Sequence, residues 1–410
     1  MKADSVSLSL RGNLATMSRK LRIAVATNFF PNSSQPHRGR PMYNQTKALS
    51  KLADVKVFCI EPRYPGWKAL QPRSFAYRSS EAGHSVPGVE VEYLYYPAFP
   101  IISRPFNGYW CGYVLRRALE KFRPDLVIGY YLYPEGFGAV SAAKALGIPV
   151  LVGALGSDIR RITDEMSRLL VQKTALGATF AIAVSDELRE RLVGLGVPPQ
   201  KCKAIHNGCD ASVFRPMDRD KARAELNIQA RSELVVFTGR FVAVKGVEIL
   251  LDALALMIPS RPSLHLCCIG EGPLEQKLRF RASRPDLRGH VIFVGSARPD
   301  EISLWLAASN VLCLPSYSEG CPNVVIEALG CGRPVVASDV GGLPELVDDR
   351  CGILVRPEDP AALSEGLSKA LDHPWDQLEI ARCYRRTWDD MAAETYELAC
   401  SVVNGKLSAS

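Results

Sequence analysis

Residues 232–258 read SELVVFTGRFVAVKGVEILLDALALMI and contain the clearest fold signal of the chain. The stretch opens with a run of β-branched and aromatic residues that predicts a buried strand, and it ends with apolar residues at helical spacing. A short glycine-flanked loop joins the two patterns, as in parallel sheets that are covered by helices. The fold class that this stretch predicts is α/β.

The same alternation extends in both directions. Apolar strand-like runs recur at residues 263–272, 290–295, 310–316 and 333–339, and an earlier series occupies residues 21–30, 54–62, 125–131 and 148–158. We therefore predict two doubly wound Rossmann-like domains that face a cleft, with ligands outside the carboxyl ends of the strands. The boundaries expected are a flexible leader at 1–19, a first domain at 20–206, a second at 207–375, and helices at 376–410 that cross back to the first domain.

Composition narrows the class of protein. The chain has 410 residues, 47% of them hydrophobic, and no apolar run of membrane-spanning length. The leader lacks the apolar core of a signal peptide, so a cytosolic protein is expected. The 12 cysteines include no C-x2-C pair, and the histidines show no ligand spacing. This pattern favours buried free thiols over a metal site or a disulfide framework.

Charge is divided unevenly along the chain. Residues 1–206 carry a net charge of +13 and residues 207–410 a net charge of −6. A basic first half suits an anionic membrane face, at the inner side of the membrane, or a phosphate-bearing acceptor, although a solvated surface of mixed charge gives the same count. Nucleic acid is not an expected partner, because no basic run with interleaved aromatics is present.

Two carboxylates mark the stretch YSEGCPNVVIEALG, residues 317–330. Pro322 suits the first turn of a helix, whose free backbone N–H groups form an anion site of the kind that phosphates use. Glu319 precedes that turn and can accept hydrogen bonds from a hydroxylated ligand. Glu327 follows about a turn later and can reach a second set of hydroxyls, such as a ribose. The alternative is one exposed loop acid and one acid on a helix face.

Two cations follow the strand at 233–238. Arg240 and Lys245 lie in the glycine-flanked loop that opens the next helix, where they could clamp a diphosphate. Taken alone, they could equally be surface cations.

The motifs TGRFVAVKG, IGEGP, FVG, SYSEGCPNVVIEALGCGRPVVASDVGGLPELV and CGILVRPEDPAAL together resemble the retaining glycosyltransferases of family 4, which have the two-domain GT-B fold. The resemblance implies that Glu319 contacts the donor sugar and Glu327 the ribose. It also implies that Arg240 and Lys245 bind the diphosphate and act with Glu319 in catalysis. Further donor contacts are expected at Gly239, Gly320, Cys321, Pro322, Asn323 and Val324. A nucleotide sugar is then the donor substrate, with no metal cofactor, and a glycan or lipid-linked polysaccharide precursor is the acceptor.

The first half resembles bacterial exopolysaccharide and teichuronic-type members of the family more loosely. Gly39 is expected near the donor phosphate, although many relatives have a second glycine where this chain has Arg40. The segment GALGSDI has Leu155 where the family often carries His or Arg. Asp158 and Arg40 are therefore expected only as residues of the acceptor side or the cleft.

Other functions remain open at the level of sequence. A non-catalytic nucleotide-sugar-binding partner or sensor would have the same fold, and Leu155 is the feature that favours it. A Rossmann dehydrogenase is disfavoured, since GEGPLE lacks the third glycine of the dinucleotide motif. The D-x-D tripeptide at residues 218–220 is expected to cap a helix rather than to bind a metal.

Overall fold

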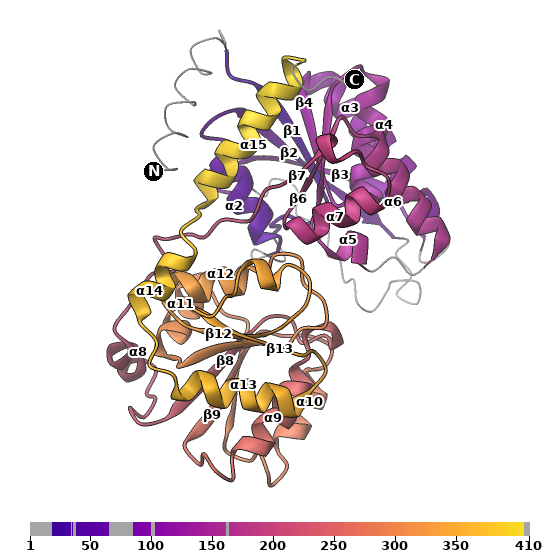
Figure 1. Cartoon of the computed structure of the whole chain (residues 1–410). Helices are drawn as coiled ribbons and strands as arrows, with labels where there is room; N and C mark the ends of the chain where they lie inside the picture. Colours follow the sequence, from indigo (N-terminus) through magenta and orange to yellow (C-terminus); the bar gives the residue numbers. More distant parts are fainter. Residues whose placement is uncertain are drawn as a thin grey trace. The chain divides into compact units, whose positions relative to one another are not determined.

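The computed structural model describes residues 19–33, 35, 38–64, 85–99, 103–160 and 164–405. The chain divides into two compact units (Figure 1). Unit 1 comprises residues 1–206 and 388–410, and unit 2 comprises residues 207–387. The segment that returns to the first unit thus begins at Trp388 rather than at residue 376, and nearly all of the expected leader lies outside the described residues. No helix in the described ranges is long and apolar enough to cross a membrane.

Unit 1 is built on a parallel sheet of seven strands in the order β3-β2-β1-β4-β5-β6-β7. The strands are β1 (Arg22–Thr27), β2 (Asp54–Arg63), β3 (Glu90–Pro97), β4 (Leu126–Tyr130), β5 (Val150–Ala154), β6 (Phe180–Ala183) and β7 (Cys202–Ala204). The connecting elements are α2 (Arg40–Leu49), η2 (Arg104–Phe106), α3 (Asn107–Phe122), η3 (Leu132–Gly136), α4 (Phe137–Ala145), α5 (Ser157–Arg160), α6 (Glu165–Gly177), α7 (Asp186–Gly194) and η4 (Pro199–Lys201). Every residue of β4 and β5 is buried, as expected for central strands that are covered on both faces.

The returning helix α15 (Trp388–Val403) completes the core of unit 1 and packs against α2 (Figure 1). Its Met391, Tyr396 and Ala399 join one apolar cluster with Met42 and Leu49 of α2. The acidic side chains of this segment also lower the net charge of the unit from the +13 of residues 1–206 to +10.

Unit 2 has a parallel sheet of six strands in the order β10-β9-β8-β11-β12-β13. The strands are β8 (Glu233–Thr238), β9 (Leu264–Ile269), β10 (Val291–Gly295), β11 (Val311–Leu314), β12 (Val335–Ser338) and β13 (Gly352–Val355). The helices and short turns are α8 (Arg219–Glu225), η5 (Ala243–Lys245), α9 (Val247–Met257), α10 (Glu275–Ala282), α11 (Pro299–Ala308), α12 (Asn323–Gly330), η6 (Leu343–Glu345), α13 (Pro360–Asp372) and α14 (Gln377–Cys383). The two parallel sheets with their covering helices confirm the prediction of two Rossmann-like domains.

Local sequence explains these elements. In α9, the buried residues Val247, Leu250, Leu251 and Leu254 fall on one helical face. Asp218 caps α8 by accepting a hydrogen bond from the backbone N–H of Lys221 at 3.0 Å. This confirms that the D-x-D tripeptide begins a helix.

Each sheet reverses its strand order at one point. The reversal lies between β1 and β4 in unit 1 and between β8 and β11 in unit 2. The loops that follow these strands meet at the carboxyl edge of their sheet, which is where open α/β sheets bind ligands. Four loops are therefore placed to carry function: 28–39, of which the structure describes 28–33, 35 and 38–39, and 131–136 in unit 1, and 239–246 and 315–322 in unit 2.

Candidate functional site

The loop that follows β8 packs closely against the loop that follows β11 because residue 246 is a glycine. Gly246 has a φ of +64°, and an added Cβ would lie 2.0 Å from the carbonyl oxygen of Pro315. A side chain at this position would therefore separate the two loops. The backbone N–H of Tyr317 donates to the carbonyl of Val244 at 2.8 Å and holds the loops together.

An ion pair joins two of the expected catalytic residues. Lys245 Nζ lies 2.5 Å from Glu319 Oε1, and the Ser316 hydroxyl donates to the same oxygen at 2.6 Å. The side chains of Lys245 and Glu319 are 23% and 9% exposed, so water only partly screens the pair. Sequence reasoning assigned both residues to the site but did not predict that they bind each other.

Unused backbone donors follow Glu319. The N–H groups of Gly320, Cys321, Asn323 and Val324 donate to no acceptor within the described part of the chain. Those of Asn323 and Val324 belong to the first turn of α12, where the helix dipole also favours negative charge. This group of amides is a ready site for an anion.

The start of α12 differs in one detail from the expectation. Pro322 takes the N-cap position with extended φ and ψ of −73° and 113°, and the helix begins at Asn323. Asn207 donates through Nδ2 to the Cys321 carbonyl at 3.2 Å and to Asn323 Oδ1 at 3.0 Å. These bonds hold the turn before the helix.

The other expected donor residues have different surroundings. Arg240 is exposed, and its side chain makes no hydrogen bond or ion pair with a described residue. Gly239 uses its N–H in a bond to the Ile269 carbonyl at 2.9 Å, so this amide is already engaged. Glu327 lies half-buried on α12, one turn after Asn323, and has polar contacts of its own.

In unit 1, Gly39 ends the loop after β1. Its φ is +62°, and an added Cβ would lie 2.0 Å from the carbonyl oxygen of Phe29, so the loop folds back closely on itself. Gly39 precedes α2 directly, and its carbonyl accepts the N–H of Tyr43 at 3.0 Å. Arg40 is the first residue of that helix, is half-buried and has contacts of its own.

A buried charged cluster beside this loop was missed by sequence reasoning. Arg38 donates to Glu61 Oε1 at 2.7 Å and to the carbonyl of Asn28 at 2.5 Å, and both charged side chains are at most 5% exposed. Glu135 of η3 is 1% exposed, and its carboxyl oxygens have no hydrogen-bond partner among the described residues. Burial raises the pKa of Glu135 to about 8. The signal that could have revealed the cluster is Glu61, a charged residue within the apolar run of β2.

Asp158 acts as an anchor for the local backbone. Its carboxylate accepts the N–H groups of Leu132, Leu155 and Gly156 at 3.1, 3.1 and 2.8 Å. Its oxygens are therefore engaged in joining the turn after β4 to the turn after β5. Burial raises the pKa of Asp158, although these hydrogen bonds oppose the effect.

Comparison with known proteins identifies the family. Residues 232–373 match the model for glycosyl transferases group 1, and residues 39–213 match the model for glycosyltransferase family 4. A D-inositol 3-phosphate glycosyltransferase from Nocardioides is 30% identical over 353 residues, with 76% of each chain covered. The chain belongs to glycosyltransferase family 4. The resemblance drawn from its motifs is thereby confirmed, and the alternative of a Rossmann dehydrogenase is excluded.

Further relatives agree with this assignment. The teichuronic acid biosynthesis glycosyltransferase TuaC of Bacillus subtilis is 26% identical, with 85% of this chain and 89% of TuaC covered. Two solved structures share the fold. HepE from Anabaena, in complex with UDP and glucose, has a TM-score of 0.66 at 22% identity, with 94% and 96% coverage. Sucrose-phosphate synthase from Thermosynechococcus elongatus has a TM-score of 0.68 at 20% identity, with 95% and 97% coverage.

As a family 4 glycosyltransferase, the chain is an enzyme that transfers a sugar from a nucleotide-sugar donor. Two cations, Lys245 and Arg240, and the free amides near Asn323 occur in loops at one sheet edge of unit 2. Such a group of preorganised positive charges and dipoles can stabilise a departing diphosphate.

Proposed function

We propose that the loops at the β8 and β11 switch point bind the donor. Lys245 and Arg240 bind the diphosphate, together with the free amides of Gly320, Cys321, Asn323 and Val324. Glu319 accepts hydrogen bonds from the hydroxyls of the transferred sugar, and Glu327 accepts them from the ribose. The observation that carries this proposal is the 2.5 Å contact between Lys245 and Glu319, which brings a cation and a carboxylate from two loops to one point.

The chemistry that we infer is substitution at the anomeric carbon. The bond from this carbon to the diphosphate oxygen breaks, and a bond to the acceptor oxygen forms on the same face, so that the anomeric configuration is retained. The acceptor hydroxyl loses its proton to the departing phosphate oxygen. Lys245, Arg240 and the amides balance the negative charge of that phosphate, and no metal ion is required.

Unit 1 supplies the acceptor side in this proposal, and Gly39 is proposed as a donor-binding residue. A pocket of about 430 Å³ lies at the carboxyl ends of β2 and β3. Its lining includes Tyr64, Tyr95, Tyr96 and Phe99, with Arg63 at the same edge. Aromatic faces suit the apolar faces of sugar rings or a lipid chain, and arginine suits a phosphate. Asp158 is then a positioning residue for the neighbouring turns rather than an acceptor ligand.

Binding of the donor can be tested before the acceptor is known. Thermal unfolding is followed with UDP-, GDP- and ADP-sugars, and NAD serves as the control. A donor present at about 100 times its Kd adds about 2.7 kcal/mol of stability. A shift with one nucleotide sugar that is lost in Arg240→Ala supports the site, and a shift with NAD alone contradicts it. Released nucleoside diphosphate then measures turnover with glycan and lipid-linked acceptors.

Peripheral contact with an anionic membrane is a second part of the proposal. Phe106, Tyr109, Trp110 and Tyr113 are 43–59% exposed along η2 and α3. The guanidinium of Arg117 lies 4.7 Å from the ring centre of Tyr113, so cations border these aromatics. Exposed aromatics beside cations are typical of surfaces that bind anionic lipid headgroups.

Sedimentation with lipid vesicles tests this surface. The wild-type chain should sediment with phosphatidylglycerol vesicles and stay in solution with phosphatidylcholine vesicles. Trp110→Ser combined with Phe106→Ser should weaken binding at least about tenfold, because burial of each ring contributes roughly 1.5–3 kcal/mol. The matched control is Phe280→Ser, a similarly exposed aromatic in unit 2. Equal binding by the two variants would refute the assignment.

A further inference from the structure

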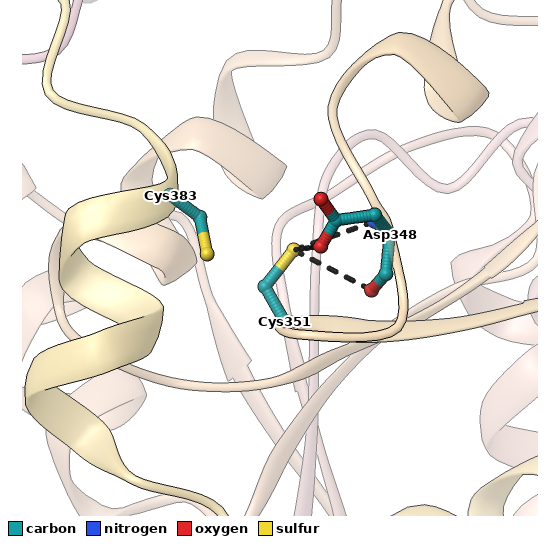
Figure 2. Close-up of side chains that lie close together, drawn as sticks. All are labelled: Asp348, Cys351 and Cys383. Atoms are coloured by element: carbon teal, nitrogen blue, oxygen red, sulfur yellow. Dashed lines mark hydrogen bonds between the residues drawn. The ribbon is translucent and has the colours of Figure 1, made fainter.

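Three side chains of unit 2 that could ligate a metal converge away from the loops described above. Asp348 and Cys351 lie in the turn that precedes β13, and Cys383 is the last residue of α14. One ligand atom from each lies within 4.8 Å of the others. Figure 2 shows both sulfur atoms and the carboxylate pointing into the space between the turn and the helix.

The thiol of Cys351 lies close to three oxygen atoms, and its sulfur also accepts the backbone N–H of Asp348 at 3.5 Å. Its Sγ lies 3.5 Å from Asp348 Oδ1, 3.7 Å from the carbonyl of Asp348 and 3.7 Å from the carbonyl of Leu346. One S–H proton cannot satisfy three acceptors at once, so this electronegative site is better suited to a cation. Cys351 is 1% exposed, whereas Cys383 is half-buried and gives access from solvent.

We propose that Cys351, Cys383 and Asp348 bind one divalent cation of the zinc type, with water as the fourth ligand. Thiolate ligands select such borderline-soft ions over magnesium or calcium. Zinc prefers tetrahedral geometry, with bonds of about 2.3 Å to sulfur and about 2.0–2.2 Å to carboxylate oxygen. Those bond lengths require a sulfur-to-oxygen separation of roughly 3.5 Å. The 3.5 Å between Cys351 Sγ and Asp348 Oδ1 meets this requirement.

The charges around the site also balance. Asp348 Oδ2 accepts two bonds from Arg350, at 2.5 Å from Nη2 and 2.9 Å from Nε. Oδ1 accepts the backbone N–H of Arg350 at 3.1 Å and also faces Cys351, which leaves it a further lone pair for a cation. Two thiolates and one carboxylate carry three negative charges, and a divalent cation with the Arg350 guanidinium carries three positive charges. Binding forms two metal–sulfur bonds and one metal–oxygen bond in place of bonds to water, and it releases two thiol protons to solvent. Because binding releases protons, affinity should rise with pH.

The site would fix the end of α14 to the sheet of unit 2. The residues that follow α14 pair with the start of this unit: the N–H of Cys209 donates to the Arg386 carbonyl at 2.9 Å, and the Tyr384 hydroxyl donates to the Asn207 carbonyl. Asn207 in turn holds Cys321 and Asn323 before α12. A bound metal ion would therefore stabilise α14 and, through Asn207, the turn before α12 that carries the free amides. It would not contact the substrate.

Cobalt is the probe, because its thiolate complexes absorb light where the metal-free protein does not. The full chain is reduced, freed of metal with a chelator and titrated with Co²⁺. One cobalt per chain should bind with a thiolate-to-cobalt absorption band, and Zn²⁺ should displace it. Cys383→Ser and Cys351→Ser should each abolish the band, while Asp348→Asn should weaken binding by at least about tenfold. The matched control is Cys400→Ser, another half-buried cysteine, which should leave the band unchanged.

Because Cys351 is fully buried, its variant could fail to fold, and Cys383→Ser therefore decides the result. Absence of the band in the reduced wild-type chain, or its persistence in Cys383→Ser, would overturn the proposal. The reduced chain could also bind no cobalt and form a Cys351–Cys383 disulfide on oxidation. That result would assign the two cysteines to redox chemistry and would overturn the proposal as well. This test is independent of donor binding, so its failure would leave the proposed function standing.

Discussion

Replacing Lys245 with methionine tests whether the ion pair with Glu319 serves catalysis rather than folding. Methionine keeps the length of the side chain and removes the charge. The pair is short, at 2.5 Å, and its side chains are 23% and 9% exposed. Exposed pairs contribute about 0–1 kcal/mol, and breaking a fully buried pair costs about 3–5 kcal/mol. We expect Lys245→Met to lower the free energy of unfolding by about 1–3 kcal/mol, which lies between these limits.

The effect on turnover should be larger. Loss of one preorganised electrostatic contact to a developing charge lowers kcat by about 10²–10³, which corresponds to roughly 2.7–4 kcal/mol. The double variant Lys245→Met with Glu319→Gln should recover part of the stability, because no buried charge is left unpaired. It should recover no turnover, since both groups that contact the donor are gone.

The assay measures released nucleoside diphosphate for turnover and urea denaturation for stability. Lys277→Met is the matched control, because Lys277 pairs with Glu248 at a similar 2.6 Å but is 66% exposed. The control should change stability by less than about 1 kcal/mol and leave turnover intact. Turnover within about threefold of wild type in Lys245→Met, or its recovery in the double variant, would refute the catalytic role of the pair.

Three other changes separate structural from functional roles. Arg240→Ala should keep the unfolding free energy within about 0.5 kcal/mol of the wild-type value, because the side chain is exposed and makes no bond to a described residue. Its turnover should fall at least about tenfold. Turnover equal to that of the wild type would exclude Arg240 from the site. Gly246→Ala should destabilise by more than about 2 kcal/mol in urea, because it adds a clash to the left-handed strain. Gly289→Ala, at φ +87° with open space around its Cβ, should cost only about 1–2 kcal/mol, and similar losses at both positions would contradict the clash. The pKa of Glu135 is raised to about 8 in the folded state, so its contribution to stability is present below about pH 4 and is lost as pH rises toward 8, by up to about 1.4 kcal/mol per pH unit. Glu135→Gln should flatten this dependence of the unfolding free energy on pH, measured by urea denaturation. An unchanged dependence would mean that the carboxyl is ionised in the folded protein.

The fold and the donor loops could be predicted because their signals are local. The run of apolar residues in β8, the glycine-flanked loop and the helical spacing of α9 are all contained in residues 232–258. Parallel topology then brings the carboxyl ends of neighbouring strands to one edge, so Lys245 and Glu319 could be assigned to the same site.

Pairings between distant residues could not be predicted in this way. The bond between Lys245 and Glu319, the buried contact of Arg38 with Glu61 and the solitary Glu135 depend on side-chain directions that no spacing encodes. Asp158 was expected only on the acceptor side or in the cleft, and the sequence gave no sign that its oxygens accept backbone N–H groups from two turns. The cysteines are free thiols in the described structure, and their spacing gave no sign that Cys351 and Cys383 meet beside Asp348.

The position of α15 has a consequence for biosynthesis. Helix α15 contributes Met391, Tyr396 and Ala399 to the apolar core of unit 1, but the ribosome makes it only after all of unit 2. Unit 2 is continuous in sequence and can complete its core while the chain is still being translated. Unit 1 must keep the apolar face of α2 uncovered until synthesis has passed residue 400, which makes the nascent first domain a natural client for chaperones.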